Sequence, residues 1–384
     1  MIDALSFLMN YETLRAIWWG LLGALLIGFA VLGGYDLGVG AMLRVIAKTD
    51  DERRVLLNAV GPTWEGNQVW FILGGGAIFA AYPLIYAAAF SGFFVALILV
   101  LFALILRPVG FDYRSKVEDP RWRGFWDWCL VIGGFVPALV FGIAFGNLLQ
   151  GVPFSYDVSM RVTYYGGFIG LLNPFGLLAG VVSVAMLCMQ GAAFLQIKTE
   201  GVIRERARRC LGIAIVVLCV AFAVAGIWLA ISIDGYRIAS FGGTAAPSNP
   251  LAKTVLHEAG AWLANYRAAP ILWLVPALMF IAAVATWLFG AARSGLAFIA
   301  SSIAVACVVL TAGITMFPFL MPSSLEPSHS LTAWDATSSL HTLRWMFWMV
   351  LLFLPVIIAY TSWVFRVMRG PVTLEHVRGP DAHY

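Results

Sequence analysis

The chain of 384 residues is 61% hydrophobic and 11% charged, with a formal net charge of +4. Ordinary soluble domains carry roughly 25% charged residues, so this composition excludes a soluble globular protein, and the small net charge gives no basis for a nucleic-acid partner. Many stretches of about 20 residues lack charge, which is the length that a helix needs to cross a bilayer. The chain is therefore predicted to be an all-α polytopic membrane protein.

Nine apolar runs predict nine transmembrane helices within a single integral membrane domain over residues 1–384. In chain order, the runs cover 16–41, 59–80, 83–106, 128–149, 165–192, 210–233, 270–291, 294–320 and 345–366. Only a tight hairpin before Pro83 separates the second run from the third, and a short turn around Arg293 separates the seventh from the eighth.

The positive residues alternate between the two sides of these nine runs. Of the 24 Lys and Arg residues, 18 fall in loops on one side, including Arg366, Arg369 and Arg378 after the last run, and 6 fall on the other. The cytoplasmic loops of membrane proteins carry such an excess. We therefore expect the N-terminus outside and the C-terminus in the cytoplasm.

Two long loops are expected on the outer side, over 233–269 and 321–344. In the first, Asn249 and Pro250 suit the start of a helix, as a capping residue followed by proline in the first turn. The segment from Leu251 to Tyr266 mixes apolar and charged side chains. This pattern predicts a short helix that lies at the membrane interface.

Two acids interrupt the apolar runs. Asp36 lies near the end of the first run, in GGYDLGVG (33–40), and Glu65 lies near the start of the second, in WEGNQVW (64–70). A carboxylate at such a depth is expensive unless it is paired, hydrated or protonated, which makes each acid a candidate functional residue. In the expected orientation both are reached from the cytoplasm, so one proton route can serve the two.

A structural interpretation of these acids stays open. Either carboxyl group can instead hold helices together through hydrogen bonds to Asn67, Gln68 or the backbone. A third charged group, RPVGFDYR (107–114), contains Arg107, Asp112 and Arg114 and is interpreted as a set of interfacial ion pairs.

The histidines lie outside the apolar runs, at positions His257, His329, His341, His376 and His383. Haem iron is usually held by histidine, and less often by methionine or cysteine, so we expect no haem or metal bound by this chain's own ligands. The five cysteines are interpreted as buried thiols. Because no nucleophile elbow, phosphate-binding loop or dinucleotide motif is present either, we expect no catalytic centre in this chain alone.

A series of longer strings resembles subunit II of the cytochrome bd-type quinol oxidases. Besides the two strings that carry the acids, they are YAAAFSGF (86–93), RPVGFDYR (107–114), FGNLLQGVPF (145–154), NPFGLL (173–178), TAGITMFPF (311–319) and SLTAWDATSS (330–339). The resemblance extends from about Tyr11 to the end of the last apolar run.

The resemblance implies a terminal oxidase that oxidises quinol, reduces dioxygen to water and generates proton-motive force in the bacterial cytoplasmic (inner) membrane. Haem b and haem d lie in the partner, subunit I. Subunit II is then a haem-free half of a heterodimer that acts as a scaffold and contributes to proton delivery from the cytoplasm. In some members it also contributes to oxygen access, holds a structural quinone or contacts small single-span accessory subunits.

Carried over residue by residue, Asp36 and Glu65 match the acids of the family's proton route, and Trp70 matches the tryptophan of its proposed oxygen passage. The chain departs from the family at two positions. Many members have Asp at the position of Glu65, and some have a further acid at the position of Gly33, so the complete route need not be preserved here.

Two interpretations from other classes accompany this one. The chain is a purely structural subunit if its acids are chemically silent. It is a proton-coupled secondary transporter if the acids serve a substrate site built on broken helices near the midplane, although polar residues are sparse there. A visible spectrum separates the transporter from the oxidase, because only the oxidase has haem bands.

Overall fold

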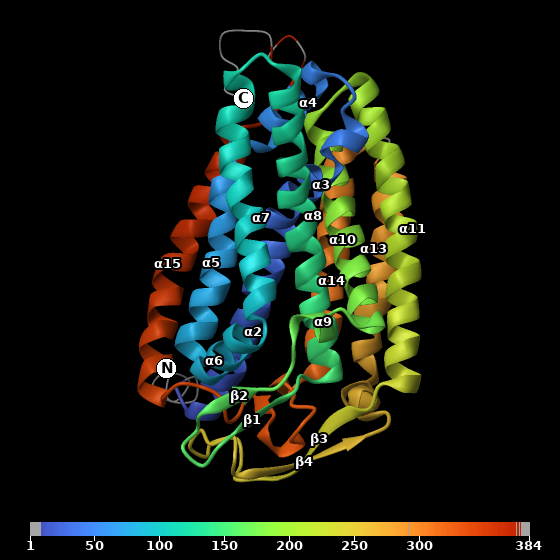
Figure 1. Ribbon diagram of the computed structural model, residues 1–384. Coiled ribbons are helices and arrows are strands. Elements are labelled where there is room, and N and C mark those ends of the chain that lie inside the picture. Colours follow the sequence, from blue (N-terminus) through green and yellow to red (C-terminus); the bar gives the residue numbers. More distant parts are fainter. Residues whose placement is uncertain (1–8, 291, 374, 376, 378–384) are drawn as a thin grey trace.

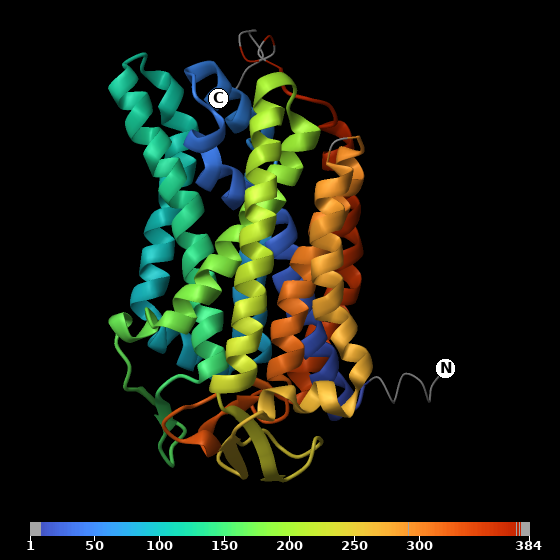
Figure 2. The same ribbon diagram turned by 90° about the vertical axis from the view of Figure 1, so that its right-hand side faces the viewer.

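A computed structural model describes residues 9–290, 292–373, 375 and 377. His376, Arg378 and His383 lie outside these residues. The described chain is a bundle of long helices that run between two ends (Figures 1 and 2). One end carries small β-sheets, and the opposite end carries the short helix α4 (Asp50–Val60).

Eight helical segments of the described chain are long and apolar enough to cross a membrane. The segments are Tyr11–Ile46, made of α2 (Tyr11–Gly28), η1 (Phe29–Gly33) and α3 (Gly34–Ile46); Phe94–Lys116, made of α7 (Phe94–Tyr113) and η2 (Arg114–Lys116); α8 (Pro120–Gln150); α10 (Pro174–Lys198); α11 (Gly201–Ser232); Pro270–Phe289, made of η4 (Pro270–Trp273) and α13 (Leu274–Phe289); α14 (Ser294–Met316); and α15 (Leu340–Val367). The prediction of a helical membrane protein is confirmed at this level.

The second of the nine predicted runs is not among the eight. It corresponds to α5 (Trp64–Ala81), whose first two turns contain Glu65, Asn67 and Gln68. These polar side chains lower the mean hydropathy of the helix, although α5 packs within the bundle against α2 and η1. The third predicted run is divided into α6 (Pro83–Gly92) and α7. The number of nine crossings and the orientation therefore stay predictions.

Helix α10 is the centre of the bundle. Within its most apolar window, 67% of the residues are buried, whereas the corresponding window of α15 has no buried residue. The helix packs against α3, α8, α11 and α14. Since α10 is mainly apolar and its few polar side chains, among them Ser183 and Gln190, are buried with the apolar ones, burial on all sides is the stable arrangement for it.

Glycine allows α3 to approach α10 closely. A Cβ atom at Gly38 would lie 1.9 Å from the carbonyl oxygen of Leu187, and one at Gly191 would lie 2.7 Å from the amide nitrogen of Val39. Small residues permit such backbone contact between membrane helices. The contact fixes the position of α3, which carries Asp36, against the centre of the bundle.

Three two-stranded antiparallel sheets of the described chain lie at one end of the bundle (Figure 1). They pair β1 (Phe154–Tyr156) with β2 (Val162–Tyr164), β3 (Gly235–Phe241) with β4 (Lys253–Glu258), and β5 (Phe319–Met321) with β6 (Leu331–Thr332). The remaining short elements are α9 (Phe168–Leu171), η3 (Ala261–Leu263), α12 (Ala264–Ala268) and η5 (Pro327–His329). The prediction of helices and no strands thus missed these connections.

The predicted helix from Leu251 to Tyr266 is wrong over its first half. The residues of β4 pair with β3, and their side chains alternate, with Lys253 and Val255 buried and Thr254 exposed. The ammonium group of Lys253 also lies 2.8 Å from the Asp335 carboxylate. Strand pairing and this buried ion pair outweigh the local helix signal, which leaves the 3-10 turn η3 and α12, a helix of five residues.

The loop expected over 321–344 ends earlier, because the side chain of Ser339 caps α15 by accepting a hydrogen bond from Thr342 N. The loop is tied to the first helix through Arg15, which is fully buried. Its guanidinium donates to Thr337 Oγ1 at 3.0 Å and to Ser248 Oγ at 2.9 Å. Both long loops are therefore held against the start of α2.

Ion pairs gather at the opposite end, where α4 meets α7 and α8. Arg114 pairs with Asp127 at 2.6 Å and with Asp50 at 2.7 Å, and Arg123 pairs with Asp50 at 2.6 Å. Partial burial opposes ionisation of Asp50, but its ion pairs with Arg114 and Arg123 outweigh burial, so its pKa lies below the ordinary value. The ion pairs predicted around Arg114 exist, although their partners are Asp50 and Asp127 and Asp112 is exposed.

Candidate functional site

Asp36 lies in the first turn of α3, directly after a turn of π-helix. The five residues of η1 interrupt the first membrane segment between α2 and α3. Short π-helical turns occur frequently at functional sites. Asp36 is 2% exposed, and a buried carboxylate is tolerated only where polar or charged groups compensate for the lost water.

A string of hydrogen bonds joins Asp36 to the start of α5. The amide nitrogen of Asn67 donates to Asp36 Oδ2 at 2.8 Å and to the Tyr35 hydroxyl at 2.7 Å. The Tyr35 hydroxyl in turn lies 2.7 Å from Thr63 Oγ1, which donates to the carbonyl oxygen of Val60 at 3.2 Å. Polar groups thus continue from the buried carboxylate to the end of α4.

Arg107 of α7 completes this group. Its side chain is buried, with the guanidinium 5.8 Å from the centre of the Trp64 ring. Arg107, Asp36 and Gln68 line the same small cavity, of about 10 Å³. Asp36 Oδ1 and Gln68 Nε2 are buried and make no hydrogen bond within the described part of the chain. We call Tyr35, Asp36, Thr63, Asn67 and Arg107 the Asp36 cluster.

The size and lining of this cavity suit a single water molecule. A water site needs about 10–15 Å³ and two to four polar partners. The cavity is at the lower limit in volume, and Asp36, Gln68 and Arg107 supply the polar partners. An acid, an amide and a guanidinium that share one water site can hold a proton or pass it on.

Glu65 lies outside the Asp36 cluster. Each residue of an α-helix turns the chain by about 100°, so side chains two residues apart point to nearly opposite faces. Asn67 is buried against Asp36, and Glu65 is accordingly exposed on the far side of α5. The structure therefore does not bring together the two acids that the sequence placed on one route.

Trp70 lies where α5 crosses the first membrane segment. Its ring packs on Gly28, the last residue of α2, where an added Cβ atom would lie 2.8 Å from Trp70 Cε3. Trp70 is partly buried. The oxygen passage predicted for it stays a prediction.

Sequence reasoning missed Arg107 as a member of the site. The third apolar run was ended at residue 106, which placed Arg107 at the membrane surface. In the structure α7 continues to Tyr113, so Arg107 lies well inside the helix. Pro108 is tolerated within α7, and a proline that does not end its helix is difficult to recognise from sequence alone.

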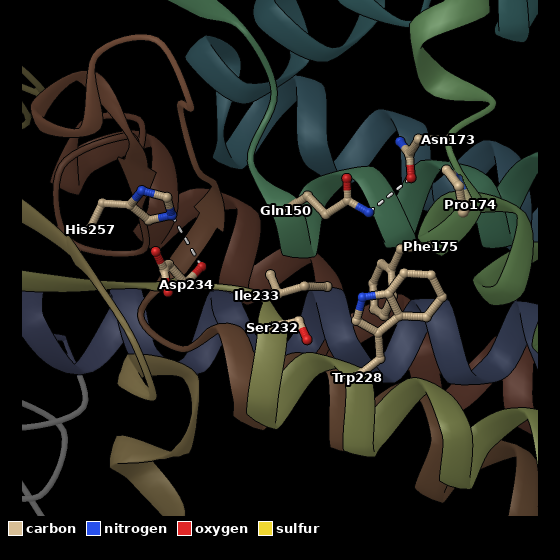
Figure 3. A pocket seen from close by; sticks show the side chains of 9 residues that line it. All are labelled: Gln150, Asn173, Pro174, Phe175, Trp228, Ser232, Ile233, Asp234 and His257. Atoms are coloured by element: carbon tan, nitrogen blue, oxygen red, sulfur yellow. Dashed lines mark hydrogen bonds between the residues drawn. The ribbon is translucent and has the colours of Figure 1, made fainter.

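A second cavity, larger and more open, lies at the sheet end of the bundle. It has a volume of about 410 Å³ and is bounded by the ends of α8 and α11, the start of α10 and strand β4 (Figure 3). We call it the α11 groove. It shares no residue with the Asp36 cluster.

Within the described residues, no group of three or more His, Cys, Asp and Glu side chains is arranged to hold a metal ion. The three described histidines lie towards the sheet end, with His257 in β4, His329 in η5 and His341 in the first turn of α15. The described chain therefore offers a polar cluster and a groove as candidate sites.

Comparison with known proteins gives full-length relatives. A model of the cytochrome bd terminal oxidase subunit II family matches residues 14–368. Subunit 2 of the cytochrome bd-I ubiquinol oxidase of Escherichia coli K12 is 54% identical over 371 residues, which cover 96% of this chain and 98% of the relative. Subunit 2 of the cytochrome bd ubiquinol oxidase of Bacillus subtilis is 32% identical over 365 residues, which cover 94% and 97%.

A solved structure has a fold similar to that of this chain. One chain of the bd oxidase from Geobacillus thermodenitrificans matches with a TM-score of 0.68, at 16% identity, over 92% of this chain and 98% of that chain. At this low identity the likeness concerns the fold alone. The arrangement of helices described above is thus similar to that of a solved bd oxidase chain.

Proposed function

We propose that the Asp36 cluster carries protons towards a haem-bearing partner. The premise is that this chain belongs to the subunit II family of cytochrome bd terminal oxidases, which its family match and its relatives show. The chain is accordingly a subunit of a quinol-oxidising oxidoreductase complex and an integral protein of the bacterial inner membrane. Membership in this family implies subunit I as its partner, and it argues against the transporter interpretation.

The observation that supports proton delivery is the line of polar side chains Thr63, Tyr35 and Asn67 that leads to the buried carboxylate of Asp36. The amide of Asn67 donates to both Tyr35 and Asp36, so it orients these two groups and does not itself relay a proton. Protons cannot cross hydrocarbon without polar groups or water to carry them. The string begins near α4, at the end where most positive residues lie and which we propose to be cytoplasmic. A water molecule in the adjoining cavity would connect Asp36 to Arg107 and continue the route.

Glu65 supports a second step of the proposal. Together with Val69, Ile72 and Phe79 it forms an exposed stripe along α5, at the spacing of one helix face. Ile72 and Phe79 are 70% and 60% exposed. An ionised Glu at this depth is expensive against lipid, so we propose that the haem-bearing subunit covers this stripe and meets Glu65 there.

The two acids then have different positions on the proposed route. Asp36 lies inside this subunit, and Glu65 lies at the seam with its partner. The buried face of α5 packs inside this subunit, and its exposed face is proposed to pack against the partner. Helix α5 would then contact both halves of the complex. This arrangement also supports the proposed scaffold role of the chain.

The remaining properties of the family are proposed for this chain in less detail. Haem b and haem d are assigned to subunit I, as the family resemblance implies. Nine crossings, with α5 as the ninth, and an external sheet end fit the distribution of 18 and 6 positive residues. Oxygen access past Trp70, a structural quinone and accessory subunits are carried over from the family resemblance.

The purely structural interpretation is the competing one, because the bond between Asn67 and Asp36 also joins α5 to α3. Quinol-dependent oxygen uptake by the purified complex separates the two. For proton delivery, Asp36→Asn and Glu65→Gln lower the rate while the haem spectrum stays unchanged. Asp112→Asn is the control, because Asp112 is an exposed acid outside the cluster. Normal uptake in both acid variants would leave only the structural role.

A further inference from the structure

The α11 groove is a site with no part in the proton route. Its two long walls are formed by Gln150 and Asn173 on one side and by Trp228 and Ser232 on the other, and Asp234 and His257 close one end (Figure 3). A volume of about 410 Å³ lies within the range of pockets that hold small molecules or headgroups, roughly 300–1,000 Å³.

The groups left free in the groove are mainly acceptors. In the described chain, Asp234 forms no ion pair and its carboxylate accepts no hydrogen bond, while its backbone carbonyl oxygen lies 3.2 Å from His257 Nε2. Gln150 uses its amide nitrogen to donate to Asn173 Oδ1 at 2.9 Å. The side-chain carbonyl oxygen of Gln150 is therefore left to face a ligand. The neighbouring Arg237 is paired with Glu258 at 2.5 Å, so it does not neutralise Asp234.

The end of helix α11 also favours a cation. It lies at the groove, and the last carbonyl groups of a helix carry partial negative charge. The last carbonyl groups of α8 are already used, since Leu149 O accepts from Trp262 Nε1 at 2.9 Å and Gln150 O accepts from the Tyr236 hydroxyl at 3.4 Å. The positive start of α10 is already satisfied, because Asn173 Oδ1 accepts a hydrogen bond from Gly176 N at 2.8 Å. Trp228 is 37% exposed, and its indole ring offers a face that attracts an ammonium group.

The outer surface of α11 indicates where such a cation comes from. Val220, Val224, Ile227 and Ile231 are exposed and follow one face of the helix towards the groove. In a membrane subunit, such a face is suited to acyl chains. A ligand that combines an ammonium group with acyl chains satisfies the groove and the helix face together.

We propose that the α11 groove binds the headgroup of an aminophospholipid, phosphatidylethanolamine, with its ammonium group on Asp234 and Trp228 and its acyl chains along α11. The ligand is held in place by one ion pair and one aromatic face, and it anchors the sheet end of the subunit to the membrane surface. Phosphatidylglycerol, which has the same acyl chains and no ammonium group, is the natural negative comparison.

The test uses the purified oxidase complex, washed with detergent to remove lipid and then mixed with one lipid at a time. Native mass spectrometry counts the lipid retained. We expect phosphatidylethanolamine to be retained in preference to phosphatidylglycerol, and Asp234→Asn to weaken its retention by about tenfold, while free ethanolamine at the same concentration does not displace it. Glu326→Gln, at an exposed acid elsewhere on the sheet end, is expected to retain it as the unmodified complex does.

Trp228→Leu provides a second variant, which keeps the groove apolar and removes the indole ring. The haem spectrum reports assembly of each complex, so if Asp234→Asn fails to assemble, Trp228→Leu decides the test. Equal retention of both lipids, or unchanged retention of phosphatidylethanolamine in both variants, would overturn the proposal. Displacement of the lipid by free ethanolamine would contradict the proposal that the bound ammonium group belongs to a lipid.

Discussion

Asn67 of α5 donates a hydrogen bond of 2.8 Å to the carboxylate of Asp36 in α3, and it is the one side chain of the described structure that hydrogen-bonds this acid. The same amide nitrogen also donates to Tyr35 at 2.7 Å. Asn67 is therefore the junction of the Asp36 cluster, and the loss of its amide separates the carboxylate from the rest of the string.

Replacement of Asn67 by Leu is expected to destabilise the complex by about 2 kcal/mol, because a buried carboxylate loses its hydrogen bond. Thermal unfolding monitored through the haem absorbance measures this change. The double variant with Asp36→Asn provides the control, since coupling between the two positions makes the combined loss smaller than the sum of the single losses. Strictly additive losses would show that Asn67 acts independently of Asp36.

Arg107→Met is expected to lower quinol-dependent oxygen uptake, because it leaves the buried Asp36 without the cation that lines its cavity. Arg107→Lys keeps the charge and should retain part of the rate. Oxygen-electrode assays at several pH values measure both variants. Arg121→Met, at an exposed position at the start of α8, is the control. Equal activities of the Met and Lys variants would contradict an electrostatic role for Arg107.

Gln190 of α10 supports the π-helical turn that precedes Asp36. Its amide nitrogen donates to the Val31 carbonyl oxygen at 3.2 Å and to Ser302 Oγ at 3.0 Å, and Ser301 Oγ donates to Gln190 Oε1 at 2.6 Å. Gln190→Leu removes all three of these hydrogen bonds from a buried site, at a cost of about 1–3 kcal/mol.

Hydrogen exchange of residues 29–36 measures this effect, and faster exchange is expected in Gln190→Leu. Ser302→Ala removes only one of the contacts and leaves the bond to Val31, so its exchange should remain close to that of the unmodified protein. If both variants exchanged alike, the support of η1 by Gln190 would be refuted.

The ion pairs of Asp50 predict a pH-dependent contribution to stability. Because the pKa of Asp50 is lowered in the folded chain, its contribution is present above the unfolded value of about 3.9 and is lost as the pH falls through the folded value. Asp50→Asn is expected to cost about 1 kcal/mol at neutral pH, since these pairs are partly exposed to solvent.

Unfolding of the Asp50→Asn complex is compared with that of the unmodified complex at neutral pH and in acid. The difference should disappear in acid, where the carboxylate is protonated in both states. Glu118→Gln, at an exposed acid in the same region, should change stability little at either pH. A difference that persisted unchanged in acid would exclude the ion pairs as its cause.

The sequence located the membrane helices and Asp36 well because apolar length and buried charge are local signals. The sequence did not show that Glu65 lies apart from Asp36, because the face of α5 on which a side chain lies depends on how this helix packs. Its end for the third run was seven residues short, because the apolar run ends where the charged residue Arg107 begins the next string, whereas α7 continues to Tyr113. Asp127 was hidden in the same way, since α8 begins at Pro120 and the corresponding run was started at residue 128.

The sheet end was the least predictable part. The helix signal around Asn249 and Pro250 was genuine as a local preference, but β4 finds its partner in β3, twelve residues or more away along the chain. Lys253 finds Asp335 across an even longer separation. Such contacts depend on tertiary structure, and neither composition nor periodicity encodes them.

The central claim is that Asp36 carries protons, and proton uptake during oxygen reduction tests it most directly. The complex is reconstituted in vesicles, reduced with quinol and mixed with oxygen while a pH dye reports uptake. The account predicts that Asp36→Asn slows uptake by at least about tenfold, below the usual range for loss of a proton-transfer group, with an unchanged haem spectrum. Uptake at the unmodified rate in this variant would contradict the account.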